Sequence, residues 1–148
     1  MNSRQNGVVV LVSGRGSNLR AIMDAIRAGQ LPAEILAVIS NEPGAPALAR
    51  ARTAGIPVHV VDHRQYPSRE EFDRALMQQI DTYRPRLVAL AGFMRILSAA
   101  FIDHYHDRLM NIHPSLLPAF PGLNTHARAL ESGATVHGAS VHFVTHEV

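Results

Sequence analysis

The chain has 148 residues, of which 47% are hydrophobic and 18% are charged, a composition typical of a single soluble globular domain. It contains no cysteine, which excludes disulfides, zinc–thiolate sites and thiol nucleophiles, and no lysine, which excludes Schiff-base catalysis and a P-loop lysine. The net charge of +2 is carried by scattered arginines and does not favour nucleic-acid binding.

The apolar runs of the chain have the length of strands. Gly7–Val12 and Leu87–Leu90 are examples, and neither is long enough to cross a membrane. The N-terminus lacks the apolar core and the small-residue cleavage site of a signal peptide. We therefore expect a cytoplasmic protein with no membrane partner.

Apolar strand-like runs alternate with segments of helical spacing along the chain. Six strands are predicted, at Gly7–Ser13, Ile35–Ser40, Pro57–Val61, Leu87–Ala91, Leu109–Ile112 and Ala139–Val144. Helices are predicted from Ser17 to Gly29, over Ala45–Ala54, from Ser68 until before Arg84, from Ser98 to about His104, and over Thr125–Ser132. This alternation predicts an α/β domain over residues 1–148 with an open, mainly parallel, doubly wound sheet.

Two of the predicted boundaries carry specific signals. Ser68 and Glu71 have the spacing of a capping box, in which the serine caps the helix and the glutamate reaches back. Gly14-Arg15-Gly16 joins the first strand to the first helix, followed by Ser17-Asn18.

The glycine loop is a candidate phosphate site. Backbone N–H groups and the positive end of the helix dipole favour an anion there, and Ser17 and Asn18 add donors. Leu19 stands where a dinucleotide-binding G-x-G-x-x-G motif needs its third glycine, which favours a monophosphate over a pyrophosphate. The alternative is a plain strand-to-helix turn with a serine cap.

The segment Asn111-Ile112-His113-Pro114 is the second candidate site. Residues two apart on a strand face the same way, so we expect Asn111 and His113 to emerge together at the carboxyl end of the fifth strand. Acyl transfer to an amine needs a donor for the developing oxyanion and a group that titrates near neutral pH. An amide and an imidazole supply both.

The other histidines are assigned to ordinary surface or core positions, although His142 could face the pocket from the last strand. The histidine spacings come with no acidic cluster, so we predict no metal site.

Four segments resemble the phosphoribosylglycinamide formyltransferase family of folate-dependent enzymes. They are S-G-R-G-S-N-L (13–19), A-G-F-M-R-I-L-S (91–98), N-I-H-P-S-L-L-P-A-F-P-G-L (111–123) and H-G-A-S-V-H-F-V-T (137–145), in the order of the family. The resemblance implies a formyltransferase fold and transfer of the formyl group of 10-formyltetrahydrofolate to the amine of glycinamide ribonucleotide, without a metal.

The resemblance also implies roles for single residues. Gly16, Ser17 and Asn18 would hold the substrate phosphate, Asn111 would steady the oxyanion, and His113 would be the general acid. The folate would be held by a further set of residues, namely Arg69, Met94, Arg95, Ile96, Leu97 and Asn111. Whether the chain forms a homodimer stays open.

The chain departs from the family at its end. The family's catalytic Asp would fall just beyond Val148, and the family's C-terminal portion is absent. A carboxylate beside His113 would raise the pKa of the imidazole. We therefore expect either a fragment or a short member with little or no activity.

Three alternatives compete with this interpretation. A methionyl-tRNA formyltransferase would have a longer chain and an Arg-Gly segment after S-L-L-P, where this chain has Ala119-Phe120-Pro121-Gly122. A formyltetrahydrofolate hydrolase would lack this phosphate loop. A nucleotide-binding module without catalysis would use the glycine loop alone.

Overall fold

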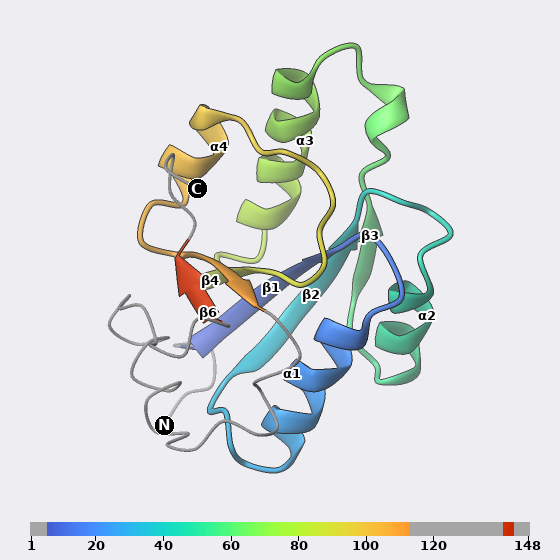
Figure 1. Cartoon of the computed structure of the whole chain (residues 1–148), viewed down its shortest axis with the longest axis vertical. Helices are drawn as coiled ribbons and strands as arrows, with labels where there is room; N and C mark the ends of the chain where they lie inside the picture. The colour runs from blue at the N-terminus through green and yellow to red at the C-terminus, as the bar shows by residue number, and fades with distance from the viewer. Residues whose placement is uncertain (1–5, 113–140, 144–148) are drawn as a thin grey trace.

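The computed structural model describes residues 6–112 and 141–143, in which strands and helices alternate (Figure 1). The strands are β1 (Gly7–Val12), β2 (Glu34–Ser40), β3 (Val58–Val60), β4 (Leu87–Leu90), β5 (Leu109–Ile112) and β6 (Val141–Phe143). The helices are α1 (Ser17–Arg27), α2 (Pro46–Thr53), the 3-10 helix η2 (His63–Gln65), α3 (Arg69–Asp81) and α4 (Ala99–His104).

The strands form one sheet in the order β3-β2-β1-β4-β5-β6. All neighbours pair in parallel except β5 and β6, which are antiparallel. The order reverses between β1 and β4, so the carboxyl ends of these two strands form the switch point at which open α/β sheets bind ligands. The predicted open, mainly parallel sheet is confirmed.

The helices cover both faces of the sheet, and Figure 1 shows α1 and α2 on one side with α3 and α4 on the other. Val8, Val10 and Val12 of β1 pack in the core beneath α1 and α2. Val9 and Leu11 pack in the second core, beneath α3 and α4. Because β1 is buried on both faces, its sequence is a continuous apolar run rather than an alternating one.

The predicted elements agree with the structure to within a few residues at their ends. The Ser68 hydroxyl accepts a hydrogen bond from the backbone N–H of Glu71 at 3.1 Å, which confirms the predicted cap of α3. The Ser98 hydroxyl caps α4 in the same way, through the N–H of Phe101. The helix predicted over Thr125–Ser132 lies outside the described residues. No helix among the described residues has the length and hydropathy to span a membrane.

Tyr105, just after α4, ties this helix to α3. Its ring is fully buried, and its hydroxyl donates a hydrogen bond to the Asp81 carboxylate at 2.7 Å. Burial raises the pKa of the Tyr105 hydroxyl, and the bond to Asp81 raises it further, so this donor stays protonated.

We expect Tyr105→Phe to lower the free energy of unfolding by about 1–2 kcal/mol, because it removes the donor to Asp81 and leaves the ring in place. Urea unfolding measures this. Tyr66→Phe is the control, since the Tyr66 ring packs on Phe72 while no hydrogen bond of its hydroxyl is seen within the described residues. Equal stabilities of the two variants would contradict the expected role of the Tyr105 hydroxyl.

Candidate functional site

The glycine loop is packed against the start of α2. The Gly14 carbonyl accepts a hydrogen bond from the Ala47 N–H at 3.1 Å. Gly16 has φ +87°, and a Cβ on it would lie 2.8 Å from the Ala47 Cβ and 2.9 Å from the Ala47 Cα. A glycine is therefore needed at position 16 both for its backbone conformation and for the approach of α2.

The first turn of α1 carries no side-chain cap within the part of the chain that the structure describes. Gly16, which has no side chain, is the N-cap residue in place of a serine, so the alternative of a serine-capped turn is wrong. The first turn also holds no acidic side chain. Helix N-termini without such a cap present N–H groups and a positive dipole end to anions.

Arg50 of α2 is a cation beside this loop. Its Nε lies 3.5 Å from the position that a Cβ on Gly16 would take. Arg50 also lines a groove of about 620 Å³ between α1 and α2, together with Arg20 and Arg27. Asp24 pairs with both Arg20 and Arg27, whereas Arg50 forms no ion pair within the described residues. The positive charge of Arg50 is thus available to an anion.

The segment between β4 and α4 forms the other side of the switch point. Gly92 turns the chain with φ +72°. Phe93 and Leu97 pack against the core beneath α3 and α4, while Met94 and Ile96 are 79% and 70% exposed. Between them, the Arg95 guanidinium lies over the Phe72 ring, 5.8 Å from its centroid.

The segment contacts the glycine loop and the residue before it. Residues 94–98 of the segment are called here the 94–98 loop. The Met94 N–H donates to the Ser13 hydroxyl at 2.8 Å. The Asn18 side-chain nitrogen lies 3.9 Å from the place of a Cβ on Gly92. The sequence-predicted phosphate and folate residues, except Arg69 and Asn111, therefore come from two loops in direct contact.

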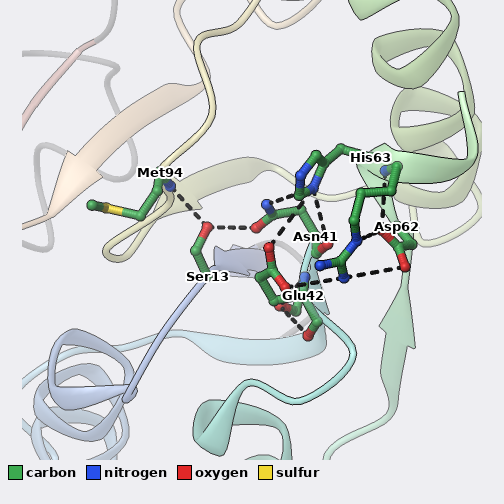
Figure 2. A network of polar contacts seen from close by, with 8 residues as sticks. Ser13, Asn41, Glu42, Asp62, His63 and Met94 are labelled. Carbon is green, nitrogen blue, oxygen red and sulfur yellow. Dashed lines mark hydrogen bonds and ion pairs between the residues drawn. The ribbon is translucent and has the colours of Figure 1, made fainter. Parts of the chain in front are cut away.

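A polar network continues from this contact across the ends of β1, β2 and β3 (Figure 2). Ser13 donates to the Asn41 side-chain oxygen, and the Asn41 amide nitrogen lies 3.2 Å from His63 Nδ1. Glu42 accepts a hydrogen bond from Arg64 at 3.1 Å. Arg64 also donates to Asp62, and this hydrogen bond lowers the pKa of the Asp62 carboxyl.

Asn111 lies near the carboxyl end of β5. Its register partner on β4 is Leu90, which directly precedes the segment that leads into the 94–98 loop. Leu90 and Leu109 both pack in the core beneath α3 and α4, so the alternation of β5 directs the half-buried Asn111 side chain to the same face. On the other side of β5, His142 of β6 is the register partner of Asn111.

Two further predicted residues are placed less directly. Arg69 is the first residue of α3, exposed, and three positions before Phe72, on which Arg95 lies. It is therefore near the 94–98 loop rather than in it. His113 lies outside the described residues, so its predicted position beside Asn111 stays a prediction. The described residues contain no group of three potential metal ligands among His, Cys, Asp and Glu.

Sequence reasoning gave no site role to Ser13, Asn41, His63, Arg50 or Asp73. Ser13 and Asn41 could have been noticed, since each is a polar residue at the carboxyl end of an apolar strand, where doubly wound folds bind ligands. Arg50 sits on α2, and Asp73 sits on α3, where its carboxylate accepts a hydrogen bond from the Ser98 N–H. Only the packing of those helices brings the two side chains to the loops.

Comparisons with known proteins relate this chain to formyl transferases. The sequence profile of the formyl transferase family matches residues 6–148. A phosphoribosylglycinamide formyltransferase of Escherichia coli is 55% identical over 141 residues, which cover 95% of this chain and 66% of that protein. The human trifunctional purine biosynthetic protein adenosine-3 is 48% identical over 95% of this chain and 14% of its own length.

Solved structures show the same relationship. A phosphoribosylglycinamide formyltransferase from Coxiella burnetii superposes with a TM-score of 0.74 at 52% identity, over 95% of this chain and 66% of that one. A glycinamide ribonucleotide transformylase from Symbiobacterium toebii also gives 0.74, at 43% identity, over 97% and 68%. The chain thus spans about two thirds of the length of these relatives. From its sequence and its fold, this chain belongs to the formyl transferase family.

Proposed function

We propose that the protein is a phosphoribosylglycinamide formyltransferase, which transfers the formyl group of 10-formyltetrahydrofolate to the amine of glycinamide ribonucleotide. The observation that carries the proposal is the contact of two different binding loops at one switch point, through Ser13 and Met94. Relatives with these activities in their names support it. Because such enzymes serve purine biosynthesis, we also propose a cytoplasmic location.

The glycine loop is the proposed site of the substrate phosphate. Gly16, Ser17 and Asn18 would surround it with the uncapped N–H groups of α1, and the dipole of the helix would favour its charge. Arg50 would add a full positive charge next to the loop. Its guanidinium suits phosphate oxygens, which accept paired hydrogen bonds.

The 94–98 loop is the proposed site of the folate ring. Within the described residues, no hydrogen bond involves the backbone groups of Arg95, Ile96 or Leu97, which leaves donors and acceptors for a heterocycle. The exposed side chains of Met94 and Ile96 would cover apolar ligand surface. Arg69 would act at a greater distance, on an outer part of the folate.

Asn111 and His113 are the proposed catalytic residues. The amine nitrogen attacks the formyl carbon, a new C–N bond forms, and the carbonyl oxygen becomes an oxyanion that accepts a hydrogen bond from Asn111. The bond from the formyl carbon to the folate nitrogen then breaks. As the oxyanion re-forms the carbonyl, His113, as imidazolium, gives that nitrogen a proton, and the attacking amine nitrogen releases one proton to water. No covalent enzyme intermediate and no metal are needed.

Calorimetric titration of the full protein with glycinamide ribonucleotide, and separately with a stable 10-formyl folate analogue, tests the proposal. Both ligands should bind, and the dephosphorylated ribonucleoside should bind at least tenfold more weakly because it lacks the charge-assisted contacts. Binding of phosphate compounds without any binding of the folate analogue would instead identify a nucleotide-binding module.

A further inference from the structure

Ser13 lies at the centre of the switch point. It directly follows β1, whose two neighbours are β2 and β4, and it is only 9% exposed. Its hydroxyl oxygen accepts a hydrogen bond from the Met94 N–H at 2.8 Å. The same hydroxyl donates a hydrogen bond to the side-chain oxygen of the buried Asn41. A serine hydroxyl has one proton, so these two bonds fix its orientation.

The Asn41 amide is itself held. With its oxygen occupied by Ser13, its nitrogen is directed at His63 Nδ1, 3.2 Å away. Figure 2 shows the resulting line of contacts from Met94 through Ser13 and Asn41 to His63. The start of the 94–98 loop is thereby attached to the ends of β1, β2 and β3, which the sheet holds in register.

The other end of the loop is attached by a second side chain. Asp73 of α3 is 1% exposed and accepts the Ser98 N–H at 2.7 Å. The loop is thus held at residues 94 and 98, by the side chains of Ser13 and Asp73. The backbone groups of Arg95, Ile96 and Leu97 between these points form no hydrogen bond within the described residues. Their direction is therefore set by the two attachments together with the packing of Leu97 on the core and of Arg95 on Phe72.

We infer that Ser13 is a positioning residue for the folate. It does not contact the ligand, but it sets the position and direction of the backbone groups of the 94–98 loop that bind the ligand. This inference rests on the proposed function. If it holds, loss of the Ser13 hydroxyl frees the start of the 94–98 loop and weakens folate binding. The ribonucleotide site is affected much less, since the glycine loop keeps its own bond from Ala47 to Gly14.

The test compares Ser13→Ala with Ser40→Ala in the full protein. Ser40 is a matched control, because it is also buried at a strand end, and within the described residues its hydroxyl bonds only to the backbone of Glu42. Ser13→Ala should raise the dissociation constant of a 10-formyl folate analogue roughly tenfold, as expected for an unpaired, partly buried N–H. Ser13→Ala should change the dissociation constant of glycinamide ribonucleotide less than about twofold. Ser40→Ala should change neither dissociation constant.

Hydrogen exchange gives an independent reading of the same contact. The Met94 amide should exchange faster in Ser13→Ala than in the unmodified protein and in Ser40→Ala. Should the alanine variant not fold, Ser13→Cys keeps the side-chain size with a weaker acceptor and should show a smaller rise in the same folate constant.

The outcomes separate the two proposals. Folate affinity that is equal in Ser13→Ala and in the unmodified protein would overturn the positioning role alone. An unmodified protein that binds no folate analogue would overturn the proposed function, and the positioning role with it. An equal loss of affinity for both ligands in Ser13→Ala would also contradict the positioning role, since it would indicate a general structural effect.

Discussion

Replacing Asn111 with alanine is expected to lower the rate of formyl transfer by about 100- to 1000-fold, the usual cost of removing one oxyanion donor. The amide lies near the carboxyl end of β5, beside Leu90 of β4 and close in register to the segment that leads into the 94–98 loop. Its side chain is half-buried, so its removal leaves no large void in the core. The loss should therefore be one of catalysis and not of folding.

Steady-state kinetics distinguish this role from simple binding. An interaction made only in the transition state lowers kcat and kcat/KM by the same factor, so KM for both substrates should stay within about threefold. Asn111→Asp should be at least as slow as the alanine variant, because a carboxylate would repel the developing negative charge. A variant with a normal kcat and a raised KM would assign Asn111 to binding, and the proposed oxyanion role would fail.

The fold could be predicted because its signals are local. β1 is an uninterrupted apolar run, and such runs indicate strands covered on both faces. The caps of α3 and α4 are serine hydroxyls bonded to N–H groups three residues later, a spacing that is visible in the sequence. The antiparallel pairing of β6 with β5 has no such signal. The prediction of a mainly parallel sheet allows one antiparallel strand but does not say which strand it is.

The candidate site could be predicted only in part. The glycine loop is recognisable from its residues and the segment that contains Met94 from the resemblance to the family, but the hydrogen bond that joins them links positions 81 apart. One of its partners is a backbone N–H, which every residue except proline carries, so no residue type marks it. The pairing of β1 with β4 brings the two ends together, and that pairing follows from the order of the strands.

Gly16→Ala is expected to lower the free energy of unfolding by about 2–4 kcal/mol and to abolish most of the affinity for glycinamide ribonucleotide. Two costs add. An alanine at φ +87° is strained, and its Cβ would lie 2.8 and 2.9 Å from the Cβ and Cα of Ala47. Since the Ala47 Cα belongs to the backbone of α2, the glycine loop or the helix must move. Either shift displaces the N–H groups that are proposed to hold the phosphate.

Two other glycines separate these costs. Gly29→Ala brings only the backbone strain, since Gly29 has φ +74° with nothing within 4 Å of a Cβ. Its free energy of unfolding should fall by about 1 kcal/mol. Gly14→Ala lies in the same loop as Gly16 but meets neither cost, because its φ is not positive and no atom lies within 4 Å of a Cβ. Its stability should change by less than about 0.5 kcal/mol.

Urea unfolding of the three variants, with ribonucleotide titration of the folded ones, measures both effects. The approach of α2 to the glycine loop predicts the order Gly16→Ala, Gly29→Ala, Gly14→Ala, from least to most stable. If Gly16→Ala were no less stable than Gly29→Ala and still bound the ribonucleotide, the contact with Ala47 would not constrain the loop. The phosphate would then have to be held elsewhere, because a loop free to move away from α2 offers no fixed set of N–H groups.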